Sequence, residues 1–216
     1  EISCSLVGSE MCIRDRPDAR AVALRSPFDP ANMGLWCARQ VRTRYKDRAD
    51  SIAKVSDLLD VMAAAQPGHY LAFFPSYSYL QQVWEDFTAR YPDQPTLCQE
   101  SAMDEGQRTE FLAQFLARDG KPLLGFAVLG GVFGEGVDLT GESLIGVAVV
   151  SPGLPQIGPR QEQLRDYFEE TRGAGFDYAY RYPGMNKVLQ AAGRVIRTPQ
   201  DRGVVLLIDD RFLAPD

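Results

Sequence analysis

Short apolar runs alternate with segments of helical period from Pro17 onward. The runs are continuous and do not alternate with polar residues, as expected for strands buried on both faces of a parallel sheet. Four are present: His69–Phe74, Pro122–Leu129, Leu144–Val150 and Gly203–Ile208. Three segments between them have helical spacing of apolar residues: Asp47–Ala65, Tyr77–Arg90 and Glu105–Arg118. Strands that alternate with helices predict an α/β domain with a mostly parallel central sheet.

The overall composition is that of an ordinary globular protein. The 216 residues are 45% hydrophobic and 24% charged, which excludes a disordered tail protein, a collagen-like fibre and a coiled coil. The net charge of −6 argues against coating of nucleic acid by bulk charge, although it leaves room for a local basic groove. No run approaches the roughly 18 consecutive apolar residues of a membrane span, so we expect no membrane association.

The histidine and cysteine content argues against a metal centre. His69 is the only histidine, which excludes most zinc sites. No two cysteines form a C-x-x-C pair, so neither a zinc ribbon nor a disulfide framework is indicated; they are Cys4, Cys12, Cys37 and Cys98. We therefore expect no metal in this chain and a reduced, cytoplasmic setting.

The first 16 residues differ from the remainder. Residues 1–16 show no helical or strand period, hold two of the four cysteines and lack the features of a signal peptide. They resemble a translated adaptor peptide, so we expect a foreign or disordered segment; a genuine flexible N-terminus is the alternative. Residues 17–216 are then expected to form one domain.

A helix that separates its apolar and polar faces is predicted at Tyr182–Arg197. Thr198 precedes Pro199, which should stop the helix near Arg197. At about 100° per residue, one stripe is apolar: Met185, Leu189, Ala192 and Ile196. A second stripe is polar and holds Gln190, Arg194 and Arg197. Gly193 lies between the two stripes. Paired guanidiniums suit phosphate, whereas a solvated face of paired charges is an equally good interpretation.

Several segments together resemble the conserved motifs of one helicase group. Gln190–Arg197 (QAAGRVIR) resembles motif VI of superfamily 2 helicases, and its continuation to Phe212 is similar to the DinG/XPD-type group. Gly130–Gly141 (GGVFGEGVDLTG) resembles motif V and His69–Tyr79 (HYLAFFPSYSY) resembles motif IV. The motifs occur in the right order and cover residues 17–212. The resemblance implies a RecA-like three-layer domain, the C-terminal motor domain of an ATP-dependent DNA helicase.

The resemblance also implies roles for residues near the nucleotide. Arg194 and Arg197 match the motif VI arginines that face the γ-phosphate as arginine fingers. The implied nucleotide-binding residues are Gln190, Gly193, Glu135, Gly136 and Asp138. The group commonly has serine before the Glu-Gly pair of motif V, where this chain has Gly134, so a hydroxyl contact is lost. A plain strand-to-helix turn is the alternative interpretation of this glycine-rich segment.

Single-stranded DNA is the substrate that the resemblance implies. Ser76, Tyr77 and Ser78 follow a buried strand, at the edge where α/β sheets place ligands, and could bond phosphate or stack a base. A helix cap at Ser76 with Tyr79 in the core is the alternative. A second basic candidate stretch is less favoured: Arg39, Arg42, Arg44, Lys46 and Arg48. We expect motifs IV, V and VI to lie along one edge of the sheet.

The first motor domain of such helicases has no counterpart in these residues. No G-x-x-x-x-G-K-[ST] phosphate loop is present, so we expect this chain alone to be inactive as an ATPase. The resemblance implies ATP and Mg²⁺ in the intact enzyme, with an N-terminal RecA-like domain as partner. In that half the group often carries a 4Fe–4S cluster, for which Cys37 and Cys98 are too few here. A non-catalytic module for nucleic acid or protein that keeps the fold is the alternative function.

Overall fold

Over the part of the chain that the structure describes, the central sheet has six strands, and each neighbouring pair runs parallel. The computed structural model describes residues 28–117, 121–131, 133 and 144–213. The strands are β1 (Met33–Cys37), β2 (His69–Phe74), β3 (Thr96–Cys98), β4 (Leu123–Val128), β5 (Gly146–Val150) and β6 (Gly203–Ile208). Their order across the sheet is β1-β6-β5-β2-β4-β3. The predicted α/β class with a mostly parallel sheet is confirmed.

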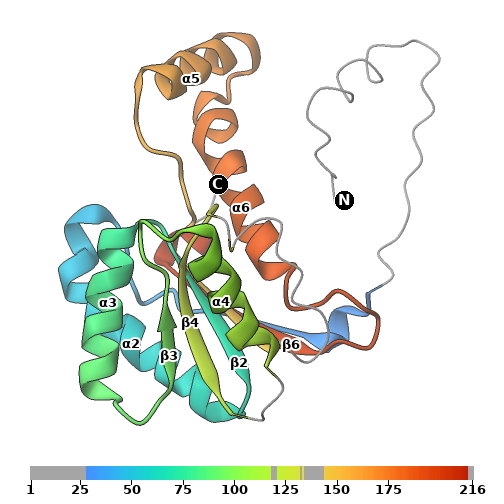
Figure 1. The fold of residues 1–216 in the computed structure, drawn as a ribbon. Coiled ribbons are helices and arrows are strands. Elements are labelled where there is room, and N and C mark those ends of the chain that lie inside the picture. The colour runs from blue at the N-terminus through green and yellow to red at the C-terminus, as the bar shows by residue number, and fades with distance from the viewer. Residues whose placement is uncertain (1–27, 118–120, 132, 134–143, 214–216) are drawn as a thin grey trace.

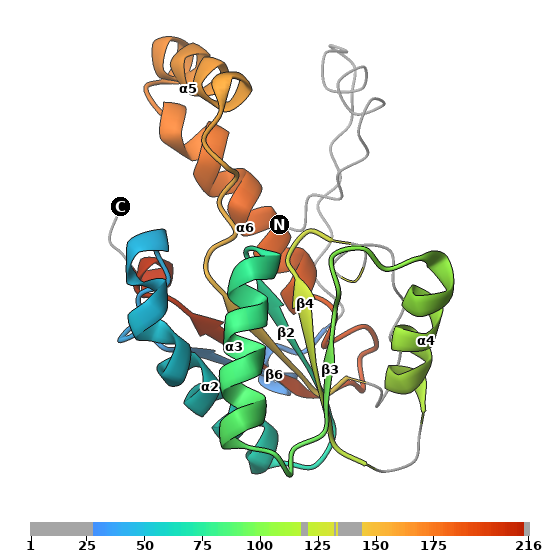
Figure 2. The same cartoon turned by 60° about the vertical axis from the view of Figure 1, so that its left-hand side comes forward.

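Helices cover both faces of this sheet and complete three layers (Figures 1 and 2). The helices that the sheet packs against are α2 (Arg48–Ala65), α3 (Tyr77–Arg90), α4 (Glu105–Leu116) and α6 (Tyr182–Ala192). On one face α2 and α3 share a hydrophobic core with the sheet. On the other face α4 and α6 share a second core. The polypeptide therefore buries its strands on both sides, as their continuous apolar sequences predict.

Strand β2 shows how one sequence feeds both cores. All six of its residues are buried. Because successive side chains of a strand point to opposite faces, Tyr70 and Phe74 join the core under α2 and α3. Leu71 and Phe73 join the core under α4 and α6. The central position of β2, between β5 and β4, follows from this two-sided burial.

Helix α6 ends earlier than its sequence pattern predicts. Its last residue is Ala192, and Gly193, Arg194 and the following residues form a turn. The amides of Gly193 and Arg194 bond to Leu189 and Ala191 carbonyls, so the last turn tightens and does not continue as a helix. Glycine favours such an end because it is a poor helix former. The predicted helix to Arg197 is therefore wrong over its last five residues.

The buried face of α6 is also shifted by one position from the predicted stripe. Gly184, Val188 and Ala191 are buried, whereas Leu189 is 63% exposed. The prediction of Leu189 in the core is wrong. Apolar periodicity along a helix gives the approximate direction of the buried face, but it does not fix which neighbouring residues point directly at the sheet. An exposed leucine beside Gln190 leaves the outer face of α6 apolar as well as polar.

A helical arm joins β5 to α6. Helix α5 (Pro159–Arg172) and a π-helical turn (Asp177–Arg181, η4) lead into α6, and Figure 1 shows α5 projecting away from the sheet. No side chain of α5 is buried. Stacked rings hold the arm together, with ring centroids 4.5 Å apart for Phe168 and Tyr178. The packing of this arm is therefore local.

A buried carboxylate links three strands at their carboxyl ends. Asp209, directly after β6, has no exposed surface. Its oxygens accept hydrogen bonds from the Thr43 amide at 3.0 Å, the Thr43 hydroxyl, and the Arg211 guanidinium at 2.7 and 3.0 Å. Arg211 Nη2 also donates to Ser151 Oγ at 3.2 Å, just beyond β5. Burial raises the pKa of Asp209, but the bonds from Arg211 and Thr43 outweigh it and lower the pKa to about 2.

We expect Asp209→Asn to destabilise the fold in a pH-dependent way. The pKa of Asp209 is about 2 in the folded protein and about 3.9 in the unfolded chain. The ionised carboxylate therefore stabilises the folded state at any pH above its unfolded pKa. This stabilisation is lost as the pH falls through the folded pKa. The variant should lose about 2–3 kcal/mol at pH 7, and its deficit against wild type should shrink between pH values of about 4 and 2. Urea unfolding across this range measures both effects. Exposed Asp93→Asn is the control, and a deficit independent of pH would contradict the ionised assignment.

Candidate functional site

The motif VI segment lies at the amino edge of the sheet. Helix α6 starts near the carboxyl end of β5, where a Cβ added to Gly184 would lie 2.7 Å from the Pro152 carbonyl oxygen. It then crosses the sheet, and the chain after it leads into β6. Val195 packs on Gly203, the first residue of β6. Arg194 and Arg197 are therefore placed where the strands begin.

The two arginines differ in burial. Arg194 is only 6% exposed, in a position between the α6 end and the buried Val195. Arg197 is half-buried, and Gln190 and Gly193 are exposed. The four residues of this motif that are predicted to contact the nucleotide thus lie close together in sequence, in the last turn of α6 and the turn after it. The two arginines do not lie on one face of a helix, because α6 ends before them.

A carboxylate holds the turn that carries Arg197. Asp201 Oδ2 accepts hydrogen bonds from the Arg197 amide at 2.8 Å and from the Thr198 amide at 2.7 Å. Asp201 Oδ1 accepts from the Thr198 hydroxyl at 2.8 Å. Burial raises the pKa of Asp201, but these bonds outweigh it and keep the pKa below its ordinary value. Sequence reasoning missed Asp201, although T-P-x-D is a turn signal that could have found it.

Motif V begins at the carboxyl end of β4. The Leu129 amide bonds to the Phe74 carbonyl at 2.8 Å, and Gly130 has a left-handed backbone at φ 73°. Phe133 is buried, and its ring stacks on Phe111 of α4 with centroids 4.2 Å apart. It shares its core with Val188 and Val195. Motifs V and VI therefore lie on the same face of the sheet. The predicted residues Glu135, Gly136 and Asp138, with Gly134, lie outside the described residues.

Motif IV opens helix α3 at the carboxyl edge. Ser76 is the N-cap, and its hydroxyl oxygen accepts from the Tyr79 amide at 3.4 Å. Tyr79 is fully buried and bonded to Ser51, so the helix-cap interpretation of this segment is confirmed. Tyr77 and Ser78 are exposed in the first helical turn. The DNA contacts predicted for Ser76, Tyr77 and Ser78 stay predictions.

The residues around this helix start form a polar edge. Tyr77 Oη accepts from Gln99 Nε2 at 3.0 Å, and Gln99 Oε1 accepts from the Val128 amide at 2.8 Å. Arg48 Nη1 lies 3.3 Å from Ser76 Oγ, and its guanidinium lies over the Tyr79 ring. The structure thus brings Arg48, from the less favoured basic stretch, to motif IV. Gln99 carried no sequence signal.

The expectation that all three motifs share one edge is wrong. Motif IV lies where strands end and the motif VI arginines lie where β6 begins. A connection between neighbouring parallel strands must return the chain from one edge to the other, and α6 makes that return between β5 and β6. Its first turn and the turn after its last residue therefore lie at opposite edges.

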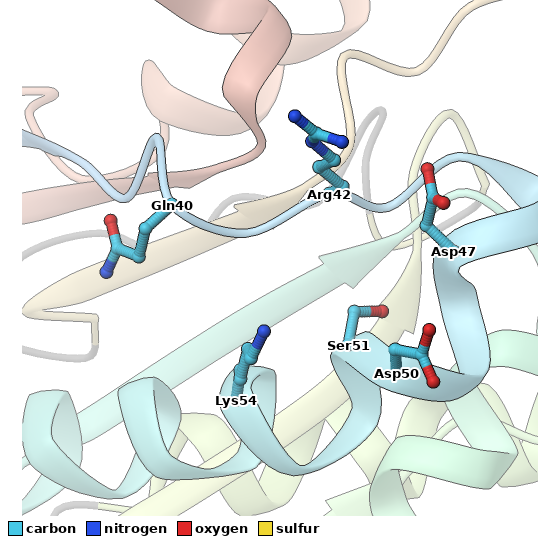
Figure 3. Close-up of a pocket in the computed structure, with 6 residues that line it drawn as sticks. All are labelled: Gln40, Arg42, Asp47, Asp50, Ser51 and Lys54. Carbon is cyan, nitrogen blue, oxygen red and sulfur yellow. The ribbon is translucent and has the colours of Figure 1, made fainter.

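Two arginines of the basic stretch beside β1 share one carboxylate. Arg44 Nη1 bonds both oxygens of Asp210, at 2.7 and 2.8 Å, and Arg42 Nε lies 3.4 Å from the same carboxylate. A pocket of about 370 Å³ lies here, and its lining mixes both charge signs. Figure 3 shows the residues that line it: Gln40, Arg42, Asp47, Asp50, Ser51 and Lys54. The mixture of carboxylates and cations does not favour a phosphate group.

The described residues show neither a metal-binding cluster nor a membrane-spanning helix. No group of three or more histidine, cysteine, aspartate or glutamate side chains among them is arranged to hold a metal ion. None of the described helices combines the length and apolar character that a membrane crossing needs. Cys37 and Cys98, the two described cysteines, are free.

Comparison with solved structures defines the class of this fold. The structure named XPD_APO superimposes with a TM-score of 0.69 at 19% sequence identity, over 84% of this chain and 36% of that chain. The structure named XPD_Helicase gives 0.67 at 19% identity, over 84% of this chain and 32% of that one. The domain thus has the RecA-like fold.

Sequence comparison places the chain in its family. The Helicase C-terminal domain family matches residues 59–216, and the chain belongs to it. ATP-dependent DNA helicase YoaA of Escherichia coli is 28% identical over 90% of this chain and 29% of its own length. Regulator of telomere elongation helicase 1 of Bos taurus is 30% identical over 80% of this chain and 16% of its own length. This is the C-terminal helicase domain of the DinG/XPD type, and it spans under a third of these relatives.

We expect Arg194→Ala to destabilise the domain and Gln190→Ala to leave it nearly unchanged. Arg194 is buried, so its removal strands polar groups and leaves a void, at a cost of about 2 kcal/mol. Gln190 is exposed, and such substitutions stay within about 0.5 kcal/mol. Urea unfolding of the two variants measures the difference. Equal unfolding midpoints would mean that Arg194 adds nothing to the fold.

Proposed function

We propose that this chain is the second motor domain of an ATP-dependent DNA helicase that acts on single-stranded DNA. The observation that carries the proposal is the opposite placement of two polar segments on one sheet. Arginines that suit phosphate lie at the amino edge, and a helix start with exposed Tyr77 and Ser78 lies at the carboxyl edge. A domain of this kind can touch a nucleotide with one edge and a strand of DNA with the other.

The amino edge completes an ATP site against a companion motor domain. Arg194 and Arg197 act as arginine fingers: their planar guanidiniums donate paired hydrogen bonds to the oxygens of the transferring phosphoryl group. Gln190 and Gly193 are exposed next to them and line the nucleotide. Glu135, Gly136 and Asp138 are assigned to the same site on their resemblance to motif V. Bound ATP with Mg²⁺ supplies the phosphoryl group that is hydrolysed.

The companion domain supplies what the chain does not contain. A phosphate loop, the residues that hold Mg²⁺ and any 4Fe–4S cluster belong to that N-terminal RecA-like half. This chain alone is then inactive as an ATPase, because no phosphate loop occurs in its sequence to hold the β-phosphate. The free Cys37 and Cys98 thiols accord with a reduced, cytoplasmic enzyme.

The carboxyl edge binds the DNA backbone and bases. The first turn of α3 directs amides toward this edge, and helix N-termini attract phosphate. Arg48, held against Ser76, adds a positive charge. Tyr77 presents a partly exposed ring whose hydroxyl Gln99 fixes, which suits stacking on a base. Ser78 is exposed for a phosphate contact.

Closure of the two motor domains on ATP links the two edges. When the arginines close on the phosphates, the domain moves as a body and carries its DNA edge with it. Helix α6 runs between the edges and shares one core with Leu129 and Phe133. Hydrolysis releases the arginine contacts, so repeated cycles move the enzyme along the strand.

We expect Arg197→Ala in the full-length helicase to lower kcat by about 10³-fold or more with little change in ATP affinity. Charge builds on the phosphoryl oxygens mainly in the transition state, so an arginine finger acts on turnover. Arg197→Lys should rescue poorly, because lysine is a point charge without the planar fork. Arg194→Ala should lower kcat in the same way, once corrected for folded protein.

Steady-state ATPase assays and DNA binding without nucleotide test this assignment. Affinity for single-stranded DNA should survive both substitutions, because the arginines lie at the edge opposite motif IV. Loss of DNA affinity with normal DNA-independent hydrolysis would place the arginines in the DNA groove. Wild-type kcat in both variants, with DNA binding intact, would favour the non-catalytic module instead.

We expect Tyr77→Ala to weaken single-stranded DNA binding by about 10-fold, because base–aromatic stacking contributes about 1–3 kcal/mol. Tyr77→Phe should retain most of the affinity, since the ring stacks and the hydroxyl only orients it. Fluorescence anisotropy with a labelled oligonucleotide measures both variants. Tyr167→Ala, on the exposed surface of α5, is the control. Equal affinity of Tyr77→Ala and wild type would remove Tyr77 from the DNA path.

A further inference from the structure

We propose that Asp201 is a positioning residue that holds the backbone of Arg197 in the orientation that the ATP site requires. The inference rests on the proposed arginine-finger role of Arg197 and extends it to a residue that does not touch the nucleotide. It concerns the turn between α6 and β6, all of which the structure describes.

The Asp201 side chain accepts hydrogen bonds from the donor groups at the start of this turn. One oxygen, Oδ2, receives the amides of both Arg197 and Thr198, at 2.8 and 2.7 Å. The other, Oδ1, receives the Thr198 hydroxyl at 2.8 Å. An amide that donates to a carboxylate four residues ahead cannot donate to the preceding helix, so the same bonds stop α6 from extending through Arg197.

The turn is closed from the other direction as well. The Asp201 amide donates to the Thr198 carbonyl at 3.2 Å, so residues 198–201 are held in a loop by bonds at both ends. Pro199, with its fixed φ, lies inside the loop and removes further backbone freedom. Its carbonyl accepts from Asn32 Nδ2 at 3.1 Å, which ties the loop to the residue before β1.

These hydrogen bonds fix the backbone of Arg197, and they do not involve the side chains of the hydrophobic core. The side chain of Asp201 is bonded to the Arg197 backbone itself, whereas Val195 supplies the nearby hydrophobic packing. Fixing that backbone limits the positions that the flexible arginine side chain can reach. Preorganised groups stabilise a transition state without reorganising during the reaction, and a misplacement of about 1 Å can cost about 10²-fold in rate.

The carboxylate is charged throughout the range in which an ATPase is assayed. Burial raises its pKa, but the amide and hydroxyl bonds outweigh it and keep the pKa below the ordinary value. The groups facing it are Arg197, Thr198 and the loop that they form, so the negative charge also offsets part of the arginine charge when no nucleotide is bound.

The test compares Asp201→Ala with Asp201→Asn in the full-length helicase. Asparagine can place its carbonyl oxygen where Oδ2 lies and keep both amide bonds, and its NH₂ group can donate to the Thr198 hydroxyl. Alanine removes all three bonds. We expect Asp201→Ala to lower kcat by about 10- to 100-fold, with ATP KM, single-stranded DNA affinity and thermal midpoint close to wild type. Asp201→Asn should keep most of the turnover. Gln200→Ala, exposed in the same loop, is the matched control.

A double substitution separates positioning from a general loss of structure. If Asp201 acts through Arg197, adding Asp201→Ala to Arg197→Ala should lower kcat no further than Arg197→Ala alone. A full additional loss, or an Asp201→Asn variant as weak as Asp201→Ala, overturns the inference. So does wild-type kcat in Asp201→Ala while Arg197→Ala is impaired. Wild-type kcat in Arg197→Ala refutes the proposed function itself, whatever Asp201 does.

Discussion

Parallel pairing of the strands that the structure describes is the constraint on which the rest of this domain depends. Each strand must be followed by a connection that returns the chain to the starting edge, and the returning helices bury both faces of the sheet. The two cores, with α2 and α3 on one side and α4 and α6 on the other, follow from it. So does the separation of the polar segments, because a helix that crosses the sheet carries its two ends to opposite edges.

Buried charge closes the carboxyl edge, where three connections leave the sheet together. Asp209 is joined to Arg211 and Thr43, and Arg211 reaches Ser151 beyond β5. Ser151 adopts φ 81°, which a side chain rarely does, and this network holds it there. Removing one member of such a network leaves the others buried without partners, so the network both fixes the geometry of this edge and stabilises the fold.

The sequence pattern was a good guide wherever burial alone decides structure. The bounds of β2, β6 and α3 agree with the predicted ranges because continuous apolar runs and a serine cap define them. Strands β1 and β3 escaped prediction, since edge strands are short and half-exposed and leave no long apolar run. The end of α6 also escaped, because apolar periodicity does not register the local turn in which Asp201 accepts the amides of Arg197 and Thr198. The residues of the arginine motif were found from resemblance, whereas their edge and unequal burial needed coordinates.

Unequal burial divides the two arginines of one motif between folding and chemistry. Arg194 is enclosed beside Val195, so packing fixes its side chain, and the proposed function adds a phosphate contact to that structural role. Arg197 lies in a turn that polar bonds define, and its amide donates to the Asp201 carboxylate. A loss of activity on changing Arg194 therefore mixes a loss of stability with a loss of transition-state contact. Arg197 reports the chemistry more cleanly, because the hydrophobic core nearby does not depend on its side chain.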